Sequence, residues 1–433
     1  MERDELLQLS GTLLRWASMG RFGSKSVRKE VRKAIQGLMD QDAVKTGAVS
    51  RASRDALEEM RAYLEKRLGG AGGTLDAEEA LALTRTLMDS TVVREEPIQF
   101  EGKPGVRVVV RGRMNLGSLG NRSRILLQDK KHLERIAVSE RRSQTFLERF
   151  EELEQDNTRI AAEGSAKEKK AFKAALKENV AGLEAQTWFQ KMQALWTGAA
   201  FSNQSLAIDY INNAIKLMPE YPVYHFFRGN ANYYWKQYTL ALRDYGEALR
   251  LDAKYADAFN NRGNTHSALK DFEAALEDYS KAVKLNTQDA ALVNNRANAK
   301  YHLNKLKEAL KDYGKAVALE PENPVYYNNR GNAWHALEKF PQAVEDYTQA
   351  LRLAPEYATA QHNRGLAHVA LEHWNDALAD FNGAIRSDSH HAEAYFQKGK
   401  LLQRTGNRGA AEREWRKAAK LGSPEARRLM AKG

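Results

Sequence analysis

The chain has 433 residues, of which 42% are hydrophobic and 28% charged, the composition of a soluble globular protein with two or three domains. It contains no cysteine, which excludes disulfides, thiol catalysis and cysteine-ligated zinc, and it has no run of eighteen apolar residues, so no membrane span is expected. The formal net charge is +11. Residues 101–150 alone hold 12 basic and 5 acidic side chains, a net charge of +7 (12 − 5).

The sequence pattern of the N-terminal segment predicts helices. It lacks a basic start followed by an apolar core, so we expect no signal peptide and a cytoplasmic location. Residues 1–70 are expected to be an amphipathic helical segment. Its two helical patterns are "SVRKEVRKAIQGLMDQ" and "RDALEEMRAYLEKRLGG", and the second pattern ends at Gly69 and Gly70.

The sequence of residues 74–118 predicts a small α+β module. A helix is expected around "AEEALALTRTLM", followed by a β-hairpin. The hairpin is indicated by valines that alternate with Arg107 and Arg111 in "VRVVVRGRM", as in a strand with one basic face. Residues 103–105 have the composition of its turn.

The sequence of residues 119–184 predicts a long charged helix from Arg122 to Ile160. A lysine-rich linker is expected to follow it. Apolar residues approximate a heptad, but polar residues such as Glu140 and Ser143 interrupt it. A short helical hairpin, or packing along the region that follows, therefore fits better than a dimeric coiled coil.

From residue 185 to residue 433 the chain is built of repeats with a fixed period of 34. One anchor is an alanine, which recurs at Ala241, Ala275, Ala309, Ala343, Ala377 and Ala411. A second anchor is a basic residue, at Arg228, Arg262, Arg296, Arg330, Arg364 and Lys398. Such a period indicates stacked supersecondary units, none of which can bury its apolar face alone.

Each unit reads as two helices, for example over residues 256–268 and 272–285. With Gly at position 8, Ala at 20 and 27, and Tyr or Phe at 24, the unit resembles the tetratricopeptide repeat. Six regular units follow one irregular unit, and "SPEARRLMAKG" predicts a capping helix. The expected fold is thus mainly α: a right-handed α-solenoid of about seven helix-turn-helix units, preceded by the small α+β module and the long charged helix.

An acidic residue follows each repeated basic residue after sixteen positions. Arg228 is followed by Asp244, and in the last unit both change together, to Lys398 and Glu414. We expect each couple to be an ion pair, either within one unit or across to the next, and to contribute mainly to stability.

Repeat positions 6 and 9 are predicted to bind the backbone of an extended peptide. They carry asparagines although asparagine costs roughly 0.5 kcal/mol relative to alanine in a helix. An amide offers both a donor and an acceptor, and in similar tetratricopeptide proteins these positions line the concave groove. Hydrogen bonding inside the solenoid is the alternative. The predicted peptide-binding residues are Asn230, Asn261, Asn264, Asn295, Asn298, Asn329, Asn332 and Asn363, with Tyr233 and Tyr301 as aromatic neighbours.

The expected function is a non-enzymatic scaffold or adaptor that binds an extended segment of a partner protein. The alternative is a nucleic-acid- or envelope-associated assembly factor whose basic N-terminal half binds an anionic partner. No catalytic motif, no cofactor and no metal site are expected. "GGAGG" lacks the Lys-Ser or Lys-Thr of a P-loop, and the histidines occupy differing repeat positions.

Overall fold

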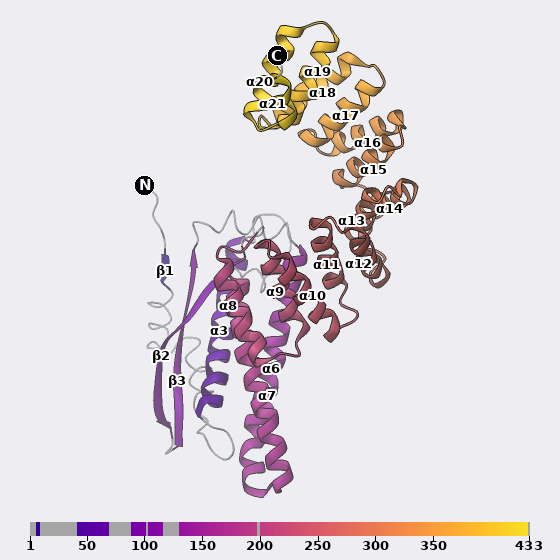
Figure 1. Ribbon diagram of the computed structural model, residues 1–433. Helices are drawn as coiled ribbons and strands as arrows, with labels where there is room; N and C mark the ends of the chain where they lie inside the picture. The colour runs from indigo at the N-terminus through magenta and orange to yellow at the C-terminus, as the bar shows by residue number, and fades with distance from the viewer. Residues whose placement is uncertain are drawn as a thin grey trace. The chain divides into compact units, whose positions relative to one another are not determined.

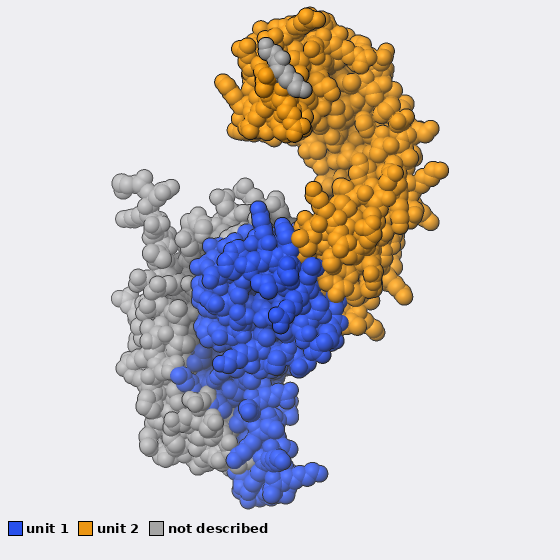
Figure 2. All heavy atoms as spheres, viewed as in Figure 1, with its two compact units in different colours: residues 1–251 blue, residues 252–433 orange. Residues whose placement is uncertain are grey.

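The computed structural model describes residues 6–8, 41–68, 88–100, 103–115, 130–196 and 200–431. The chain divides into two compact units, residues 1–251 and 252–433, which Figure 2 colours separately. The helices predicted at residues 26–41 and 77–88 lie outside the described residues, except for Gln41, which begins a helix, and Met88, which begins a strand. No helix among the described residues is long and apolar enough to cross a bilayer.

The first unit contains a three-stranded antiparallel sheet, in the order β1-β3-β2. Strands β2 (Met88–Phe100) and β3 (Lys103–Asn115) form the predicted hairpin, and β1 (Leu6–Gln8) pairs with the end of β3. The predicted turn at residues 103–105 was wrong, because these residues pair with 98–100 inside the strands. Pro104 is tolerated there because β3 has only one neighbouring strand at that point. The proline nitrogen can point away from that strand, so no hydrogen bond between the strands is lost.

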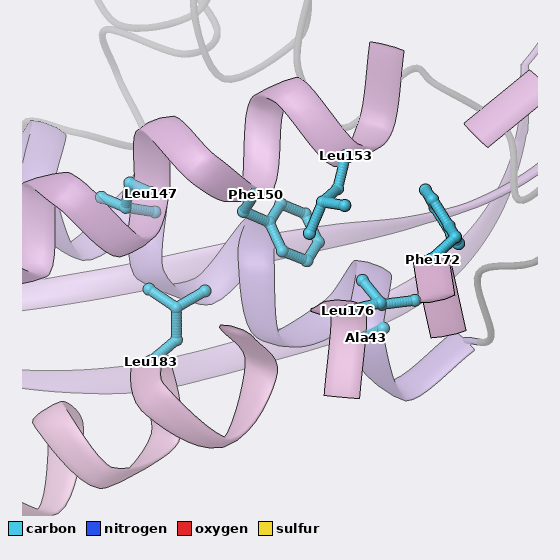
Figure 3. Packing of buried hydrophobic residues seen from close by; sticks show 7 residues of the cluster. All are labelled: Ala43, Leu147, Phe150, Leu153, Phe172, Leu176 and Leu183. Atoms are coloured by element: carbon cyan, nitrogen blue, oxygen red, sulfur yellow. The ribbon is translucent and has the colours of Figure 1, made fainter. Parts of the chain in front are cut away.

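Helix α3 (Gln41–Leu68) packs against β3 and against α7 (Figure 1). The second helix predicted in this segment starts at Arg54, and the observed helix begins thirteen residues earlier. Its N-terminal half joins a hydrophobic core with α6 and α7 (Figure 3). Gly47 is needed for the close approach, since a Cβ there would lie 2.2 Å from the ring of Phe150. The core residues are Ala43, Leu147, Phe150, Leu153, Phe172, Leu176 and Leu183.

The charged region folds as a helical hairpin, one of the two arrangements that the sequence favoured, and the lysine-rich stretch expected as a linker is instead part of its second helix. Helix α6 (Lys130–Glu163) and helix α7 (Ala166–Gln193) pack antiparallel, as in the pairing of Phe146 with Asn179 and of Ser139 with Gln186. Ser165 caps α7 through a reciprocal capping box with Glu168. Helix α7 continues through residue 185, where the repeat region was predicted to begin. The predicted domain boundaries stay predictions.

The polar residue that interrupts the heptad forms part of a buried layer between these helices. Glu140 is 1% exposed and accepts a hydrogen bond of 3.1 Å from Gln190 Nε2. Ser139 bonds with Gln186 and Gln193 of α7 in the same layer. A buried polar layer of this kind contributes to the choice of helix register, which explains why the apolar repeat breaks there.

The rest of the chain is a succession of paired helices, as predicted. Helix α8 (Gln204–Leu217) packs on α7 and forms the irregular first unit. The first regular unit is α9 (Pro222–Tyr234) with α10 (Tyr238–Leu251). The others are α11 (Ala256–Ala268) with α12 (Phe272–Leu285), α13 (Ala290–His302) with α14 (Leu306–Leu319), α15 (Pro324–Ala336) with α16 (Phe340–Leu353), α17 (Ala358–Ala370) with α18 (Trp374–Ser387), and α19 (Ala392–Arg404) with α20 (Arg408–Lys420).

The array ends in the predicted capping helix α21 (Pro424–Met430). Ser423 accepts a hydrogen bond from the Ala426 N–H, and Pro424 occupies the first turn, where no N–H is needed. Ala426 is buried against Tyr395 and Ala418, so α21 covers the apolar end of the last unit.

A strained backbone position recurs in the turn inside each unit. The residue after the first helix's C-cap has a positive φ, although in five units it is not glycine. These residues are Lys236 (φ 61°), Lys270 (φ 63°), Asn304 (φ 58°), Glu338 (φ 58°) and Glu372 (φ 58°), and only the last unit uses glycine, Gly406 (φ 89°).

Glycine should therefore stabilise these turns. We expect Lys270→Gly to raise the free energy of unfolding by about 0.5–1 kcal/mol, because it relieves the left-handed strain of an exposed side chain. Glu273→Gly, three residues later in helical backbone, is the matched control and should lower it by about 0.5–1 kcal/mol. Urea denaturation measures both. Equal losses in the two variants would show that the strain has no cost.

Candidate peptide-binding site

The repeated charges pair inside each helical hairpin, and not across to the next unit. Arg262 donates from Nε and Nη2 to both carboxylate oxygens of Asp278, each at 2.7 Å. This two-bond geometry recurs with Arg296 on Asp312, Arg330 on Asp346 and Arg364 on Asp380. Arg228 bonds one oxygen of Asp244, and Lys398 lies 3.0 Å from Glu414. Because each pair joins the first helix of a unit to its second, the pairs close the hairpins.

The third regular unit places a second cation on its aspartate. Lys300 Nζ lies 2.8 Å from Asp312 Oδ2, and Trp334 occupies the same repeat position beside Asp346. Burial raises the pKa of the Asp312 carboxyl, but hydrogen bonds from Arg296 and Lys300 outweigh it, so the pKa lies below its ordinary value. At Asp346 burial prevails over Arg330 and raises the pKa.

The asparagines at position 9 accept a hydrogen bond from a tyrosine of the same unit. The hydroxyl of Tyr279 donates to Asn264 Oδ1 at 2.8 Å, and Tyr313 donates to Asn298 Oδ1 at 2.6 Å. The same contact joins Tyr245 to Asn230 and Tyr347 to Asn332, each at 2.8 Å. The tyrosine rings are buried, so their hydroxyls need a partner; Tyr279 has a second one in Ser267 Oγ, 3.2 Å away. Burial raises the pKa of the Tyr313 and Tyr347 hydroxyls.

The asparagines at position 6 bond along the array to the asparagine at position 5 of the preceding unit. Asn295 Nδ2 donates to Asn260 Oδ1 at 3.0 Å, and Asn329 Nδ2 donates to Asn294 Oδ1 at 3.0 Å. Asn363 Nδ2 reaches both Asn328 Oδ1 at 3.1 Å and Asn332 Oδ1 at 3.0 Å. Asn261 accepts from its neighbour Asn260 at 3.1 Å. The predicted ladder thus takes part in the solenoid's own hydrogen bonds.

The tyrosine bonds fix how the amides at position 9 are oriented. With Oδ1 held by a tyrosine, Nδ2 is the remaining polar group of Asn264, Asn298 and Asn332, and it makes no hydrogen bond within the part of the chain that the structure describes. All three residues are partly exposed. An oriented N–H₂ group at 34-residue intervals can donate to the carbonyl groups of an extended chain.

The two aromatic residues predicted for the site occupy the same position in two different repeats. Tyr233 is half-buried and packs against Tyr234 and Tyr238, with ring centroids 5.6 Å and 5.7 Å away. Burial raises the pKa of its hydroxyl. Tyr301 packs against the core that surrounds Tyr313 and is partly exposed. The two belong to different compact units, and each keeps some surface toward solvent.

The partners of the asparagines were not predicted from the sequence, although a signal was present. Position 9 is asparagine in the four regular units where position 24 is tyrosine, and it changes to Leu366 where position 24 is Phe381. A pair that changes together in tandem copies indicates contact, as it did for the charges. Position 6 carries no such signal, because Asn261 keeps its asparagine although position 5 of the preceding unit is Phe226.

Comparison with known proteins identifies the repeats. Family models described as tetratricopeptide repeat match residues 256–289, 324–357 and 362–426, and a model described as TPR repeat matches residues 229–270 and 297–338. No family model matches the N-terminal region, and no curated protein matches the chain.

Several solved structures are similar to part of the chain. YrrB, a TPR protein with an unusual peptide-binding site, is 24% identical over 43% of this chain and 97% of its own, with a TM-score of 0.35. PilF of Pseudomonas aeruginosa is 19% identical over 49% and 97%, with a TM-score of 0.43. A thermophilic TPR protein of Thermus thermophilus is 23% identical over 41% and 97%, with a TM-score of 0.37. Similarity at this level supports no conclusion about function.

The 34-residue period, the paired helices and the matched models agree over the same part of the chain. Residues 229–426 belong to the tetratricopeptide repeat family, and the solenoid that they form is a protein-interaction scaffold.

Proposed function

We propose that this chain is a non-enzymatic adaptor whose repeats hold an extended segment of a partner protein by its backbone. The observation that carries the proposal is the set of oriented amides on Asn264, Asn298 and Asn332. Each belongs to a first helix of the second compact unit, one repeat after the other. Their Nδ2 groups donate to carbonyl groups spaced along the bound segment.

Preorganisation favours this role. A free asparagine side chain must lose rotamer freedom on binding, whereas these three amides are already held by a buried tyrosine hydroxyl. Backbone carbonyls occur at every residue of a partner, so recognition by such donors places little demand on the partner's sequence. Partner choice then depends on the flanking side chains, among which Tyr301 offers a partly exposed aromatic surface.

Simple alanine substitution is a poor test, because it also removes the acceptor of a buried tyrosine. Asn298→Ala alone is expected to cost about 1–3 kcal/mol of stability, because it leaves the buried hydroxyl of Tyr313 without its acceptor. The chain itself supplies a better variant, since Leu366 and Phe381 fill the same two positions in the fifth regular unit. Asn264→Leu with Tyr279→Phe reproduces that pair and removes donor and acceptor together.

The binding test uses this paired exchange in two adjacent units. A peptide is selected for the full chain from a random displayed library and synthesised, and its Kd is measured by calorimetry. Exchanging both the 264/279 and the 298/313 pairs should weaken binding about five- to hundredfold, at about 0.5–1.5 kcal/mol for each lost hydrogen bond. Tyr279→Phe with Tyr313→Phe is the matched control: it keeps both amides but removes the hydroxyls that hold them, so it should weaken binding by less than the fourfold exchange does. Unchanged affinity of a folded fourfold variant would contradict the proposal.

A further inference from the structure

The turn between α17 and α18 gathers three metal-ligating side chains. One ligand atom each from His368, His373 and Asp376 lies within 4.8 Å of the other two. His368 is in the last turn of α17, His373 is the N-cap of α18, and Asp376 is in the first turn of α18. The site is therefore built on two helix ends and a short connection.

Backbone hydrogen bonds hold the two histidines together. The His373 N–H donates to the carbonyl of His368 at 2.9 Å, and the Glu372 N–H donates to the carbonyl of Val369 at 3.2 Å. Glu372 adopts the left-handed conformation that closes this turn. Because the cluster rests on a fixed turn, binding an ion would require few new constraints on the chain.

Neither histidine ring makes a hydrogen bond within the described residues. His368 Nδ1 is buried without a hydrogen-bond partner, and its Nε2 lies 3.9 Å from Asp380 Oδ2, too far for a hydrogen bond. His373 does not cap α18 with its side chain. A buried imidazole nitrogen without a partner is costly, and a metal ion would satisfy it.

The charges around the cluster favour a cation. Asp376 belongs to the cluster itself, and the Asp380 carboxylate lies 3.9 Å from His368 Nε2, so two acidic side chains stand beside the histidine. The nearest basic side chains are already engaged, since Arg364 pairs with Asp380 and Arg404 lies 3.6 Å from Glu372.

The combination is specific to one unit. The same three repeat positions carry Lys300, Lys305 and Glu308 in the third regular unit, and Trp334, Lys339 and Gln342 in the fourth. Lysines repel a cation and tryptophan offers no ligand, so neither unit could bind one. The family's repeat pattern does not account for two histidines and a carboxylate here.

From this geometry we infer a site for a divalent transition-metal ion of the zinc class, bound by His368, His373, Asp376 and one water. Tetrahedral zinc places its ligands about 3.4 Å apart, given metal–ligand bonds of about 2.1 Å. His373 and Asp376 are exposed and can rotate to close the remaining distance. The ion then joins α17 to α18 and stabilises the fifth regular unit.

Zinc titration of the untagged full chain tests the inference. Calorimetry with ZnCl₂ in a buffer without phosphate should show saturable binding that is retained in excess Mg²⁺, because Mg²⁺ prefers oxygen ligands. His373→Ala and Asp376→Asn alter exposed side chains, so both variants should stay folded by circular dichroism. Each should weaken zinc binding by at least about tenfold and abolish the rise in Tm that zinc causes in the parent chain.

Two further variants control for the chain's other histidines. His266→Ala changes the same repeat position in the second regular unit, beside Asp271, and His390→Ala changes an exposed histidine of the next turn. Both should bind zinc like the parent chain. Absence of saturable zinc binding, or equal affinity of His373→Ala and the parent chain, would overturn the site.

Discussion

Arg330→Ala is expected to lower the free energy of unfolding by about 3 kcal/mol. The substitution leaves Asp346, whose side chain is 7% exposed, buried without its two charge-assisted hydrogen bonds. Removing one partner of a buried ion pair typically costs about 3–5 kcal/mol, and the partial exposure of Arg330 places the expected loss at the lower end. Urea denaturation followed by circular dichroism measures it.

The third regular unit provides the control. Arg296→Ala removes the equivalent arginine, but Asp312 keeps the Lys300 ammonium group at 2.8 Å. We therefore expect a loss of only about 1–2 kcal/mol. Adding Lys300→Ala to Arg296→Ala should cost more than the sum of the two single changes, because Asp312 then has no cation. Equal losses for Arg296→Ala and Arg330→Ala would contradict the role assigned to Lys300.

The second large effect is a loss of stability in acid caused by His362. This histidine fills position 5, where the three preceding units have asparagine, and it is 7% exposed. Its ring packs on Phe381 and stacks on His391, with ring centroids 5.8 Å and 5.0 Å away, and its Nδ1 has no hydrogen-bond partner among the described residues. Burial, with a smaller contribution from His391, lowers the pKa of His362 to about 4.

The sign of the pH effect follows from this lowered pKa. Between pH 4 and pH 6.5 the unfolded chain binds a proton at His362 that the folded chain does not, so stability falls as the pH falls through this range. The full contribution is about 3 kcal/mol, at about 1.4 kcal/mol for each unit of pKa difference.

His362→Phe should remove this contribution. Phenylalanine already occupies the position in the first and last regular units, as Phe226 and Phe396, and it introduces no titratable group. The difference in free energy of unfolding between the parent chain and His362→Phe should therefore change by about 3 kcal/mol between pH 7 and pH 4. His390→Ala, which alters an exposed histidine, is the control. A difference independent of pH would show that the pKa of His362 is the same in the folded and the unfolded chain.

The repeats were predictable because their information is repeated. Six tandem copies show which positions are small, apolar or charged, and the coupled change from Arg–Asp to Lys398–Glu414 indicates direct contact without any knowledge of the fold. The direction of that contact was not predictable. Sixteen residues separate the partners in every unit, and this spacing fits both an intra-unit and an inter-unit pair until the helix packing is known.

The N-terminal half offers one copy of each pattern, which explains its errors. Pro104 and Gly105 have turn composition, but their place is set by pairing with β2, which no local signal reports. In the same way Glu140 reads as a break in a heptad, and only its contact with Gln190 shows that it belongs inside the helical hairpin.

For the asparagines, the sequence predicted the positions and left the role open. Helix propensity shows that something must offset their cost, and the structure shows that much of it is hydrogen bonding with Tyr279 and its equivalents. Hydrogen bonding inside the solenoid and peptide binding are thus not exclusive. At Asn264, Asn298 and Asn332, Oδ1 serves the first, and Nδ2 is available for the second.

The central claim is that these amide groups hold a partner's backbone, and one measurement tests it most directly. It is the Kd of the selected peptide for the chain carrying Asn264→Leu, Tyr279→Phe, Asn298→Leu and Tyr313→Phe, divided by its Kd for the chain carrying Tyr279→Phe and Tyr313→Phe alone. The account predicts a ratio of about five to a hundred, since the two chains differ in the asparagine amides. A ratio near one, with both chains folded, would contradict it.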